Sequence, residues 1–580
     1  MKKLLFCLLI LALLVIACQR FDNNASLNRD EMVPAVKLIT ETISGSHGVE
    51  TKATISNDDT PAFAWNIGDN IAVHISNGKY VTTADEGASG ASVAEATADF
   101  TVAYETGYSR DAFAIYPSTI VDADAAKYGQ SGDSLDVTLP GSYSLAQISG
   151  ETTLCPMIAD NTGTNWTFYQ LCGLLRLTVN SIPPSTKRLE INFNGKNVAG
   201  KFAIPNPVKG DGTSTIALEN ASGSNSSVIT ITNSGQTFYS GWGDGKVFNI
   251  PLPAGTYGDI TVTAYNALSD GDAVLTMTRP FGYTADRLHA TKRTASFPVF
   301  SINSSRSKRV IFAPGNLQAT TTDYGANWTW RFAEHQYDFI GSGGGNTMIN
   351  GNGTLSGENG TVDLFGWSTG KTVYGIHNST TCNALGDNDY SGSFVDWGTI
   401  KTFGGITYPD NYWKTLSSNN SDSYELWYMM RTRETNATVN NIPHARFTMA
   451  TINTDGTSVN GIILFPDYYE GPFVSTEDIT WGSKINDYGK YSGWGGTTCT
   501  KAGWKTLEAF GCVFLPAAGT RVGVNVTFGE SYYASSTNNN YPAACFHLLF
   551  SSNINPYNIY WNQTVYRYQG SSVRLAHEVQ

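Results

Sequence analysis

Hydrophobic and polar residues alternate in short runs over the first half of the chain. Runs such as "FAWNIGDNIAVHI", "DAFAIYP", "LLRLTVNSI" and "DITVTAYNA" are separated by Gly, Asn, Asp and Pro. An alternation of period two at this spacing is typical of antiparallel strands that bury one face. The pattern therefore predicts two all-β sandwich domains between about residues 53 and 300. Paired prolines at residues 181–187 disfavour ladder hydrogen bonds, so we expect domains of residues 53–180 and 181–300.

The second half, residues 310–580, has a different pattern. Trp and Tyr become dense there, and Gly-rich loops such as "GSGGGNTMINGNGTLSGENG" separate the apolar runs. The run "ACFHLLF" at residues 544–550 predicts a strand whose side chains alternate between two faces. We expect a core-facing set of Phe546, Leu548 and Phe550. The opposite face would carry Cys545, His547 and Leu549.

Three short segments lie outside these domains. Lys2, Lys3 and a short apolar run form a signal peptide at residues 1–18, which ends in "VIAC" at Cys18. Small and apolar residues before Cys18 resemble a bacterial lipobox, which implies that Cys18 carries a lipid; an ordinary signal peptide with an incidental Cys18 is the alternative. Residues 19–52 are polar and predict a leader or tether without a core. Ser and basic residues at 301–309 predict a solvated linker.

Composition and charge limit the kinds of partner. The chain has 580 residues, of which 41% are hydrophobic and only 15% charged, which excludes a disordered chain. Its net charge is -12, and Lys and Arg form no cluster beyond the extreme N-terminus. A nucleic-acid surface needs such a cluster, so we expect no nucleic-acid partner.

Six cysteines remain once Cys7 and Cys18 are set aside. They are Cys155, Cys172, Cys382, Cys499, Cys512 and Cys545. In an exported chain they can pair, but six cysteines allow fifteen connectivities and the spacing selects none. Buried free thiols are the alternative.

Motifs of known catalytic sites are missing. Glu334-His335 lacks the second His of HExxH, no GxSxG elbow occurs, and the glycines at 341–345 are not followed by GK[ST]. We therefore expect no catalytic residue, no metal and no cofactor.

The region from residue 531 to residue 569 is rich in Asn and Tyr and poor in charge. Tyr and Trp supply large contact areas at low entropic cost, and Asn supplies adaptable hydrogen bonds, as in antibody paratopes. This composition predicts a ligand-binding surface; a Tyr-rich loop that packs on its own domain is the alternative. The candidates are Tyr532, Tyr533, Asn538, Asn539, Asn540, Tyr541, His547, Asn553, Asn555, Tyr557, Asn558, Tyr560, Trp561, Asn562 and Tyr566. Arg574, between Val573 and Leu575, is expected to form a buried ion pair.

Four stretches of the first half carry a resemblance to a known family. They are "WNIGDNIAV", "AIYPS", "LLRLTV" followed by "NVAGKFAI", and "IPLPAGTYGDITVTAY", in that order. This half resembles the fimbrillin superfamily, the β-sandwich pilin subunits that anaerobic Gram-negative bacteria export as lipoproteins. The resemblance implies transthyretin-like sandwiches and assembly by exchange of a strand between subunits.

The second half resembles another family. "VIFAPGNLQ", "WRFAEHQYDFIG", "DLFGWSTG", "NGIILFPD", "GCVFLPAAGTR" and "SSVRLA" follow one another as in C-type-lectin-like domains related to the formylglycine-generating-enzyme fold. The resemblance implies an α+β domain with a helix at residues 423–433. Two departures are "YYASST", where the family usually has Tyr-Trp-Ser-Ser, and the missing sugar-and-calcium motifs of vertebrate C-type lectins.

Together the resemblances imply a multidomain, non-catalytic cell-surface adhesin at the tip of a type V pilus, anchored to the outer membrane. Its lectin-like domain would bind a glycan or a surface protein, and its sandwiches would accept a donor strand from another pilin subunit. Proteolytic removal of the leader would use Arg20 or Arg29, and Lys52 stands where an Arg is expected. The alternatives are a glycan-binding lipoprotein without a pilus, a surface protein whose terminal segment a retroelement diversifies, and an enzyme on the lectin-like fold.

Overall fold

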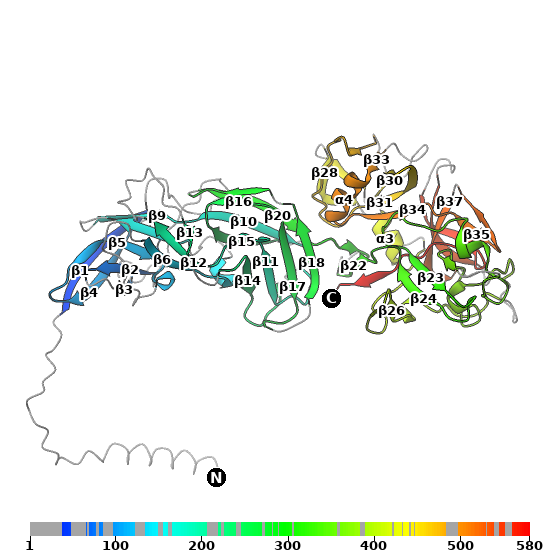
Figure 1. Ribbon diagram of the computed structural model, residues 1–580, viewed down its shortest axis with the longest axis horizontal. Helices are drawn as coiled ribbons and strands as arrows, with labels where there is room; N and C mark the ends of the chain where they lie inside the picture. The colour runs from blue at the N-terminus through cyan, green and yellow to red at the C-terminus, as the bar shows by residue number, and fades with distance from the viewer. Residues whose placement is uncertain are drawn as a thin grey trace, which may run out of the picture.

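The computed structural model is an elongated, mostly β molecule with few helices (Figure 1). It describes residues 38–47, 65, 69–76, 80–84, 97–121, 134–148, 155–160, 165–205, 218–221, 225–238, 245–269, 273–280, 282–287, 289–303, 307–356, 360–382, 389–419, 423–431, 433–439, 442–445, 447–482, 497–528, 530–538, 544–551 and 559–579. Cys18, Arg20, Arg29 and Lys52 lie outside the described residues. No helix in the described part is long and apolar enough to cross a membrane.

The first sandwich combines a seven-stranded sheet with a three-stranded one. The larger sheet has the order β3 (Tyr80–Ala84), β2 (Asn70–Ile75), β5 (Arg110–Tyr116), β8 (Met157–Asp160), β9 (Asn165–Gln170), β1 (Leu38–His47) and β4 (Thr97–Glu105). The smaller sheet consists of β13 (Glu219–Asn220), β12 (Gly200–Pro205) and β6 (Ser134–Leu139). Ile158 of the larger sheet and Val137 and Phe202 of the smaller one share a buried core, which joins the two sheets.

The strand β1 corrects the prediction of a tether at residues 19–52. It pairs antiparallel with β4, from Leu38 opposite Glu105 to Ser46 opposite Thr97, and parallel with β9. Its sequence, "LITETISGSH", is rich in β-branched residues, which favour strands. The tether prediction failed because the partners of this strand are remote in sequence and leave no local signal.

The second sandwich packs a five-stranded sheet on a three-stranded one. The first has the order β18 (Ala273–Arg279), β17 (Ile260–Tyr265), β11 (Arg188–Asn192), β14 (Val228–Thr232) and β7 (Ser142–Ser144). The second consists of β15 (Lys246–Leu252), β10 (Gly173–Asn180) and β20 (Ala290–Ser296). The two-stranded sheet of β16 (Gly255–Tyr257) and β19 (Tyr283–Ala285) and the helix α2 (Leu145–Ile148) complete this part of the chain. Because β7 and β10 precede residue 181 and pair with strands that follow it, the predicted boundary falls inside a continuous set of paired strands.

The segment between the halves, predicted as a solvated linker, is packed at both of its ends, although Ser307 and Lys308 are exposed. The strands β21 (Phe300–Ser301), β22 (Arg309–Phe312) and β40 (Ala576–Glu578) form one small sheet. Ser301, Ile302 and Arg309 are all buried. The two edges of the predicted linker therefore belong to a packed neck, and the C-terminus lies at this junction (Figure 1).

The C-terminal domain contains several small sheets and two further helices, in agreement with an α+β arrangement. Its largest sheet has the order β32 (Ile479–Thr480), β33 (Thr497–Thr500), β30 (Phe447–Thr454), β31 (Thr457–Leu464) and β34 (Val513–Pro516). The others are β24 (Thr329–Phe332), β23 (Leu317–Thr321) and β25 (Gly360–Val362); β26 (Thr402–Phe403) and β27 (Ile406–Thr407); β28 (Arg433–Val439) and β29 (Ile442–Ala445); β35 (Thr520–Val522) and β36 (Asn525–Thr527); and β37 (Glu530–Asn538), β38 (Ala544–Ser551) and β39 (Ile559–Tyr566).

Two α-helices among the described residues of this domain pack against its core. The helix predicted at residues 423–433 is present as α3 (Glu425–Arg431) and buries Met429 and Met430. In α4 (Lys501–Ala509), the Thr500 hydroxyl caps the first turn by accepting a hydrogen bond from Gly503 N at 3.1 Å.

Candidate functional site

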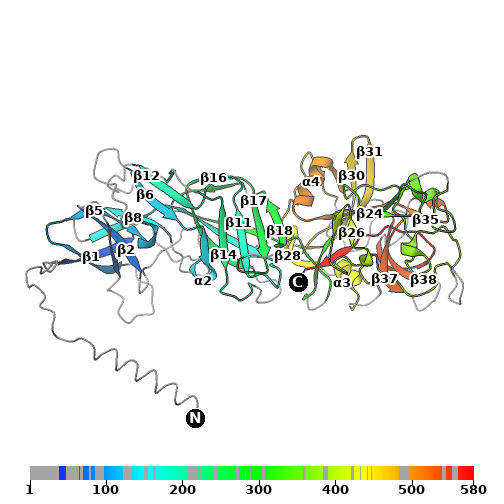
Figure 2. The ribbon, with the colours of Figure 1, turned by 60° about the horizontal axis from the view of Figure 1, so that its bottom comes forward.

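The Asn- and Tyr-rich segment forms the sheet β37-β38-β39, with β38 in the centre. This sheet belongs to the C-terminal domain and lies far from the first sandwich in both ribbon views (Figures 1 and 2). The segment therefore occupies the part of the molecule that is remote from the N-terminal sheets, where a ligand can approach without meeting them.

Three of the predicted binding residues, Tyr532, Tyr533 and His547, are buried, so their assignment as ligand contacts is wrong. The Tyr532 hydroxyl donates to Glu530 Oε2 at 2.8 Å, and its ring packs in an aromatic cluster with Trp367. The Tyr533 hydroxyl donates to Pro516 O at 3.1 Å. Burial raises the pKa of both tyrosines, which are core residues.

His547 faces the interior of the domain, contrary to the expected alternation on β38. Its Nδ1 lies 2.9 Å from the Ser571 hydroxyl, and burial lowers its pKa to about 3. Leu549, two residues on, is also buried and packs with Tyr532. The prediction that His547 and Leu549 face away from the core is therefore wrong, and the neighbouring β37 likewise buries both Tyr532 and Tyr533, which lie on opposite faces. Alternation marks the core side only where one face is exposed.

Three of the predicted residues remain accessible in the described part: Asn538 and Tyr566 are exposed, and Tyr560 is half-buried. Tyr566 is 57% exposed and stacks on Tyr568 with ring centroids 5.2 Å apart and an interplanar angle of 6°. Between them, Arg567 points inward and lies over the Trp367 ring at 5.4 Å. The two tyrosines thus form a flat aromatic platform at the end of β39, with Tyr566 exposed and Tyr568 half-buried.

The remaining predicted residues are not described in full. Trp561 and Asn562 are part of β39, but their side chains are outside the described set. The following predicted residues lie entirely outside the described part of the chain: Asn539, Asn540, Tyr541, Asn553, Asn555, Tyr557 and Asn558. Their role in binding stays a prediction.

An exposed apolar hairpin beside the platform was not predicted as part of the site. Val522 and Val524, in and beside β35, are about two-fifths exposed, and Phe528 is 56% exposed. Gln569 Nε2 donates to the Thr520 hydroxyl at 3.1 Å, which joins the base of this hairpin to the turn that follows Tyr568. The sequence "RVGVNVTF" alternates like a half-buried strand, and nothing in that alternation tells which face stays exposed.

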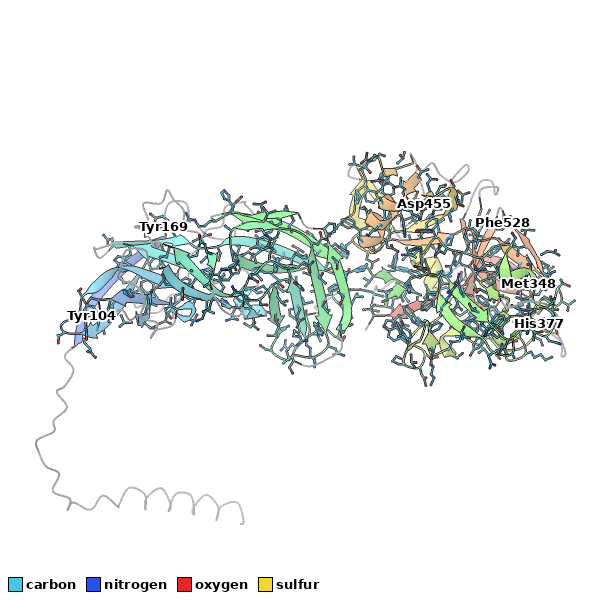
Figure 3. All side chains as sticks on the ribbon, in the orientation of Figure 1. Tyr104, Tyr169, Met348, His377, Asp455 and Phe528 are labelled. Carbon is cyan, nitrogen blue, oxygen red and sulfur yellow. The ribbon has the colours of Figure 1, made fainter. Side chains whose placement is uncertain are left out.

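We call the exposed side chains of Val522, Val524, Phe528 and Tyr566, together with the half-buried Tyr568, the distal face. In the stick view, Phe528 lies in the part of the C-terminal domain that is turned away from the sandwiches (Figure 3). Exposed apolar and aromatic groups that lie together on a protein surface mark an interaction site.

A buried arginine holds the loops under the distal face. Arg521 is fully buried, and its Nε donates to Leu364 O at 3.1 Å. Its Nη1 donates to His377 O at 2.8 Å and to Gly523 O at 2.7 Å, while its backbone pairs with Gly570. One side chain therefore ties the hairpin to two other loops. Burial lowers the pKa of this guanidinium.

Arg574 is buried as predicted, but its described partners are neutral, so the expected ion pair is wrong. Its Nη2 donates to Gln336 Oε1 at 2.8 Å and to Phe514 O at 2.6 Å. Gln336 Nε2 in turn donates to Glu508 Oε1 at 2.9 Å. The Gln336 amide thus links the guanidinium of Arg574 to the carboxylate of Glu508 by hydrogen bonds. Burial lowers the pKa of Arg574 to about 10.

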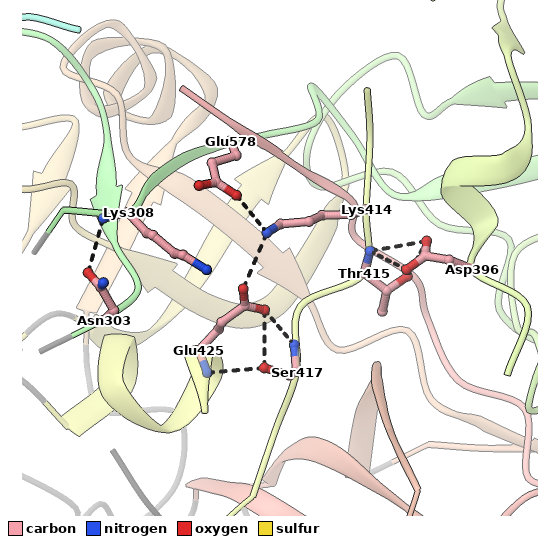
Figure 4. Close-up of polar contacts among 8 residues, drawn as sticks. All are labelled: Asn303, Lys308, Asp396, Lys414, Thr415, Ser417, Glu425 and Glu578. Carbon is pink, nitrogen blue, oxygen red and sulfur yellow. Dashed lines mark hydrogen bonds and ion pairs between the residues drawn. The ribbon is translucent and has the colours of Figure 1, made fainter. Parts of the chain in front are cut away.

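A second polar network ties the C-terminal strand to α3 (Figure 4). Lys414 Nζ lies 3.3 Å from Glu425 Oε1 and 3.1 Å from Glu578 Oε2. Glu425 Oε2 also accepts from Ser417 N at 2.8 Å. Although burial opposes it, the two carboxylates raise the pKa of Lys414, so this amine stays charged and acts as a structural tie.

No group of three or more His, Cys, Asp and Glu side chains that could hold a metal ion occurs among the residues described above. The accessible chemistry of the distal face is aromatic and apolar, with amide side chains around it. This chemistry suits recognition of a surface.

Comparisons with known proteins give matches only among solved structures. No protein-family model and no curated protein matches the chain. One matching structure is described as a "putative cell adhesion protein" from Bacteroides ovatus, with 12% identity, 45% of this chain and 92% of that chain covered, and a TM-score of 0.27.

Two other matches are fimbrial proteins. The tip fimbrial protein Mfa3 from Porphyromonas gingivalis, truncated at its C-terminus, is 11% identical, with coverage of 42% of this chain and 82% of that chain and a TM-score of 0.17. A fimbrial protein from Bacteroides ovatus is 8% identical over 93% of this chain and 99% of that chain, with a TM-score of 0.20. The chain is thus structurally similar to cell-adhesion and fimbrial proteins, at TM-scores too low to assign it to a family.

Proposed function

We propose that this chain is a non-catalytic adhesin of the cell surface that binds its ligand through the distal face. The observation that carries the proposal is the Tyr566–Tyr568 ring stack, which the bond from Gln569 to Thr520 links to the exposed apolar hairpin of the C-terminal domain. Aromatic side chains dominate the energy of protein recognition, and flat rings also suit sugar rings. The ligand is a glycan or a surface protein, and binding needs no cofactor.

Two features of the strands support a place at the tip of a pilus. The last described strand, β40, pairs with β22, and Val579, which follows β40, packs in the core of the second sandwich. This segment is therefore not available as a donor strand for another subunit. The strand β1 lies between β9 and β4, and its removal would leave two strand edges unpaired. A donor strand from another subunit could fill that gap with main-chain hydrogen bonds.

The position of β1 restricts which basic residue could release it. Arg20 and Arg29 precede Leu38, so cleavage there would leave β1 attached to the sheet. Lys52 follows His47, so only a cut at such a later position would free the strand. Before or without that cut, export and a lipid on Cys18 would place the chain on the outer membrane as a surface lipoprotein.

The first prediction tests the distal face in the full-length chain. Replacing Tyr566 and Phe528 by Ala removes two exposed rings without touching the core, so the fold should be kept. We expect affinity for the ligand found in a glycan and surface-protein screen to fall at least about tenfold, because central aromatic contacts carry most binding energy.

The matched control is Tyr108→Ala, which removes an exposed tyrosine from the first sandwich. Equal affinities of all three proteins would refute the assigned surface. Purification of native filaments distinguishes a pilus tip adhesin from a glycan-binding lipoprotein without a pilus. A tip subunit copurifies with stalk pilins, and a lipoprotein without a pilus does not.

A further inference from the structure

Two cysteines of the first sandwich, Cys155 and Cys172, lie just beyond the ladder between β8 and β9. The antiparallel register pairs Met157 with Gln170 and Ile158 with Tyr169. Leu171 N donates to Pro156 O at 2.8 Å, which continues the pairing one step beyond both strands. By the same register, the next pair is Cys155 and Cys172.

The hydrogen-bond pattern makes this pair a close one. Because Pro156 and Leu171 form a hydrogen-bonded position, the positions on either side are of the non-hydrogen-bonded type, which has a Cα separation of about 4.5 Å. A disulfide needs Cα atoms about 4.4 to 6.8 Å apart, so this position can be bridged without moving the backbone.

The surroundings bring the two sulfurs together. Cys155 and Cys172 are both fully buried in the core between the two sheets of the first sandwich. Burial, and after it the proximity of Cys155, raises the pKa of Cys172. Burial, and after it Cys172 and Cys155, raise the pKa of the Tyr143 hydroxyl.

We propose that Cys155 and Cys172 form a disulfide in the mature protein, which the structure holds as two thiols. The reaction is an exchange with a disulfide donor of the oxidising compartment that an exported chain enters. Two S–H bonds break and one S–S bond forms, and the two electrons and two protons reduce the donor's own disulfide to two thiols. The proposal rests on the proposed export for its oxidant.

The bond would fix the edge of the sheet where it is needed. β9 pairs with β8 on one side and with β1 on the other. A disulfide between the ends of β8 and β9 holds these strands in register while the position of β1 is empty or is being refilled. It also clamps the point at which the chain leaves β9 and enters β10 of the second sandwich.

The test uses the full-length chain, refolded from denaturant in a mixture of reduced and oxidised glutathione. Remaining thiols are alkylated in denaturant before any reduction, and the chain is cut with trypsin. Residues 128–176 contain no internal Lys or Arg, so one tryptic peptide carries both cysteines and no other. We expect both cysteines of this peptide to carry no alkyl group. When the peptide is cut again before Asp160, the fragment with Cys155 and the fragment with Cys172 should stay joined until a reductant is added.

The variants Cys155→Ala, Cys172→Ala and the double variant complete the test. If the bond forms, each single variant leaves the other cysteine alkylated, and all three lower the melting temperature of the first sandwich by a similar amount, roughly 5 to 10 °C. Two alkyl groups on the wild-type peptide, or a bond from either residue to another cysteine, would overturn the proposal. Ligand binding by the same refolded sample reports on the proposed function separately, because the distal face lies in another domain.

Discussion

At the scale of single residues, the distal face depends on a buried side chain that never reaches the surface. Arg521 satisfies the carbonyl groups of Leu364, His377 and Gly523. In Arg521→Met these acceptors lose their donors, and an unsatisfied buried polar group costs about 1–3 kcal/mol. We therefore predict that the free energy of unfolding of the C-terminal domain, measured by urea denaturation, falls by roughly 3 kcal/mol or more.

The control for this change is Arg331→Met, because Arg331 is exposed and donates to the Gln318 side chain at 3.0 Å. Its loss should cost less than about 1 kcal/mol. An Arg521→Met chain as stable as the control would show that the loops under the distal face do not need the guanidinium.

His547 gives the domain a stability that depends on pH. Burial lowers its folded pKa to about 3, whereas an unfolded histidine titrates near 6.5. Between these values the unfolded chain binds the extra proton, so this residue makes the domain less stable as the pH falls below about 6.5, by up to about 1.4 kcal/mol per pH unit. In His547→Asn, which has no titratable group, that loss should disappear.

The measurement is the difference in unfolding free energy between wild type and His547→Asn at pH 7 and at pH 5. Asp363 has the opposite effect, since burial raises its pKa to about 6 and favours the protonated form, so only the difference isolates His547. The wild type should lose stability relative to the variant on going to pH 5. A difference that stays constant would mean that His547 titrates normally in the folded chain.

At the scale of elements, the sequence was informative where strands bury one face. In β14 and β17 every second residue is buried, and this alternation is what predicted the sandwiches. In β37 the residues from Ser531 to Ser535 are all buried, so the period disappears and composition alone remains. Composition selected tyrosines there, but it could not separate Tyr532, which packs on Trp367, from exposed Tyr566.

Remote pairing accounts for the other differences. The partners of the strand β1 and of the neck strand β22 lie far along the chain, at β4 and β9 for the first and at β40 for the second. Nothing local to residues 38–47 or 309–312 records those partners. The apolar hairpin of the distal face was missed for a related reason, because which side of β35 is covered depends on loops near His377 and Gly570.

At the scale of the whole molecule, the second sandwich and the C-terminal domain share a buried neck. Arg279 Nη1 donates to Ala509 O at 2.6 Å, and the Ser296 hydroxyl donates to Glu470 Oε1 at 2.9 Å. Val579 packs in the core of the sandwich although it follows the last strand of the other domain. Polar bonds and apolar contacts thus cross the same junction, and the two domains should unfold together.

Arg279→Met tests this coupling, because it removes the guanidinium that bonds to Ala509 while keeping an apolar side chain in the neck. In the wild type, scanning calorimetry should show one transition for the second sandwich and the C-terminal domain, and in the variant this transition should split or broaden toward lower temperature. Lys292→Met, an exposed change on β20 of the same sandwich, should keep the single transition. Two separate transitions already present in the wild type would contradict a rigid neck. A single one would mean that contacts across the neck couple the stability of the second sandwich to that of the domain that carries the distal face.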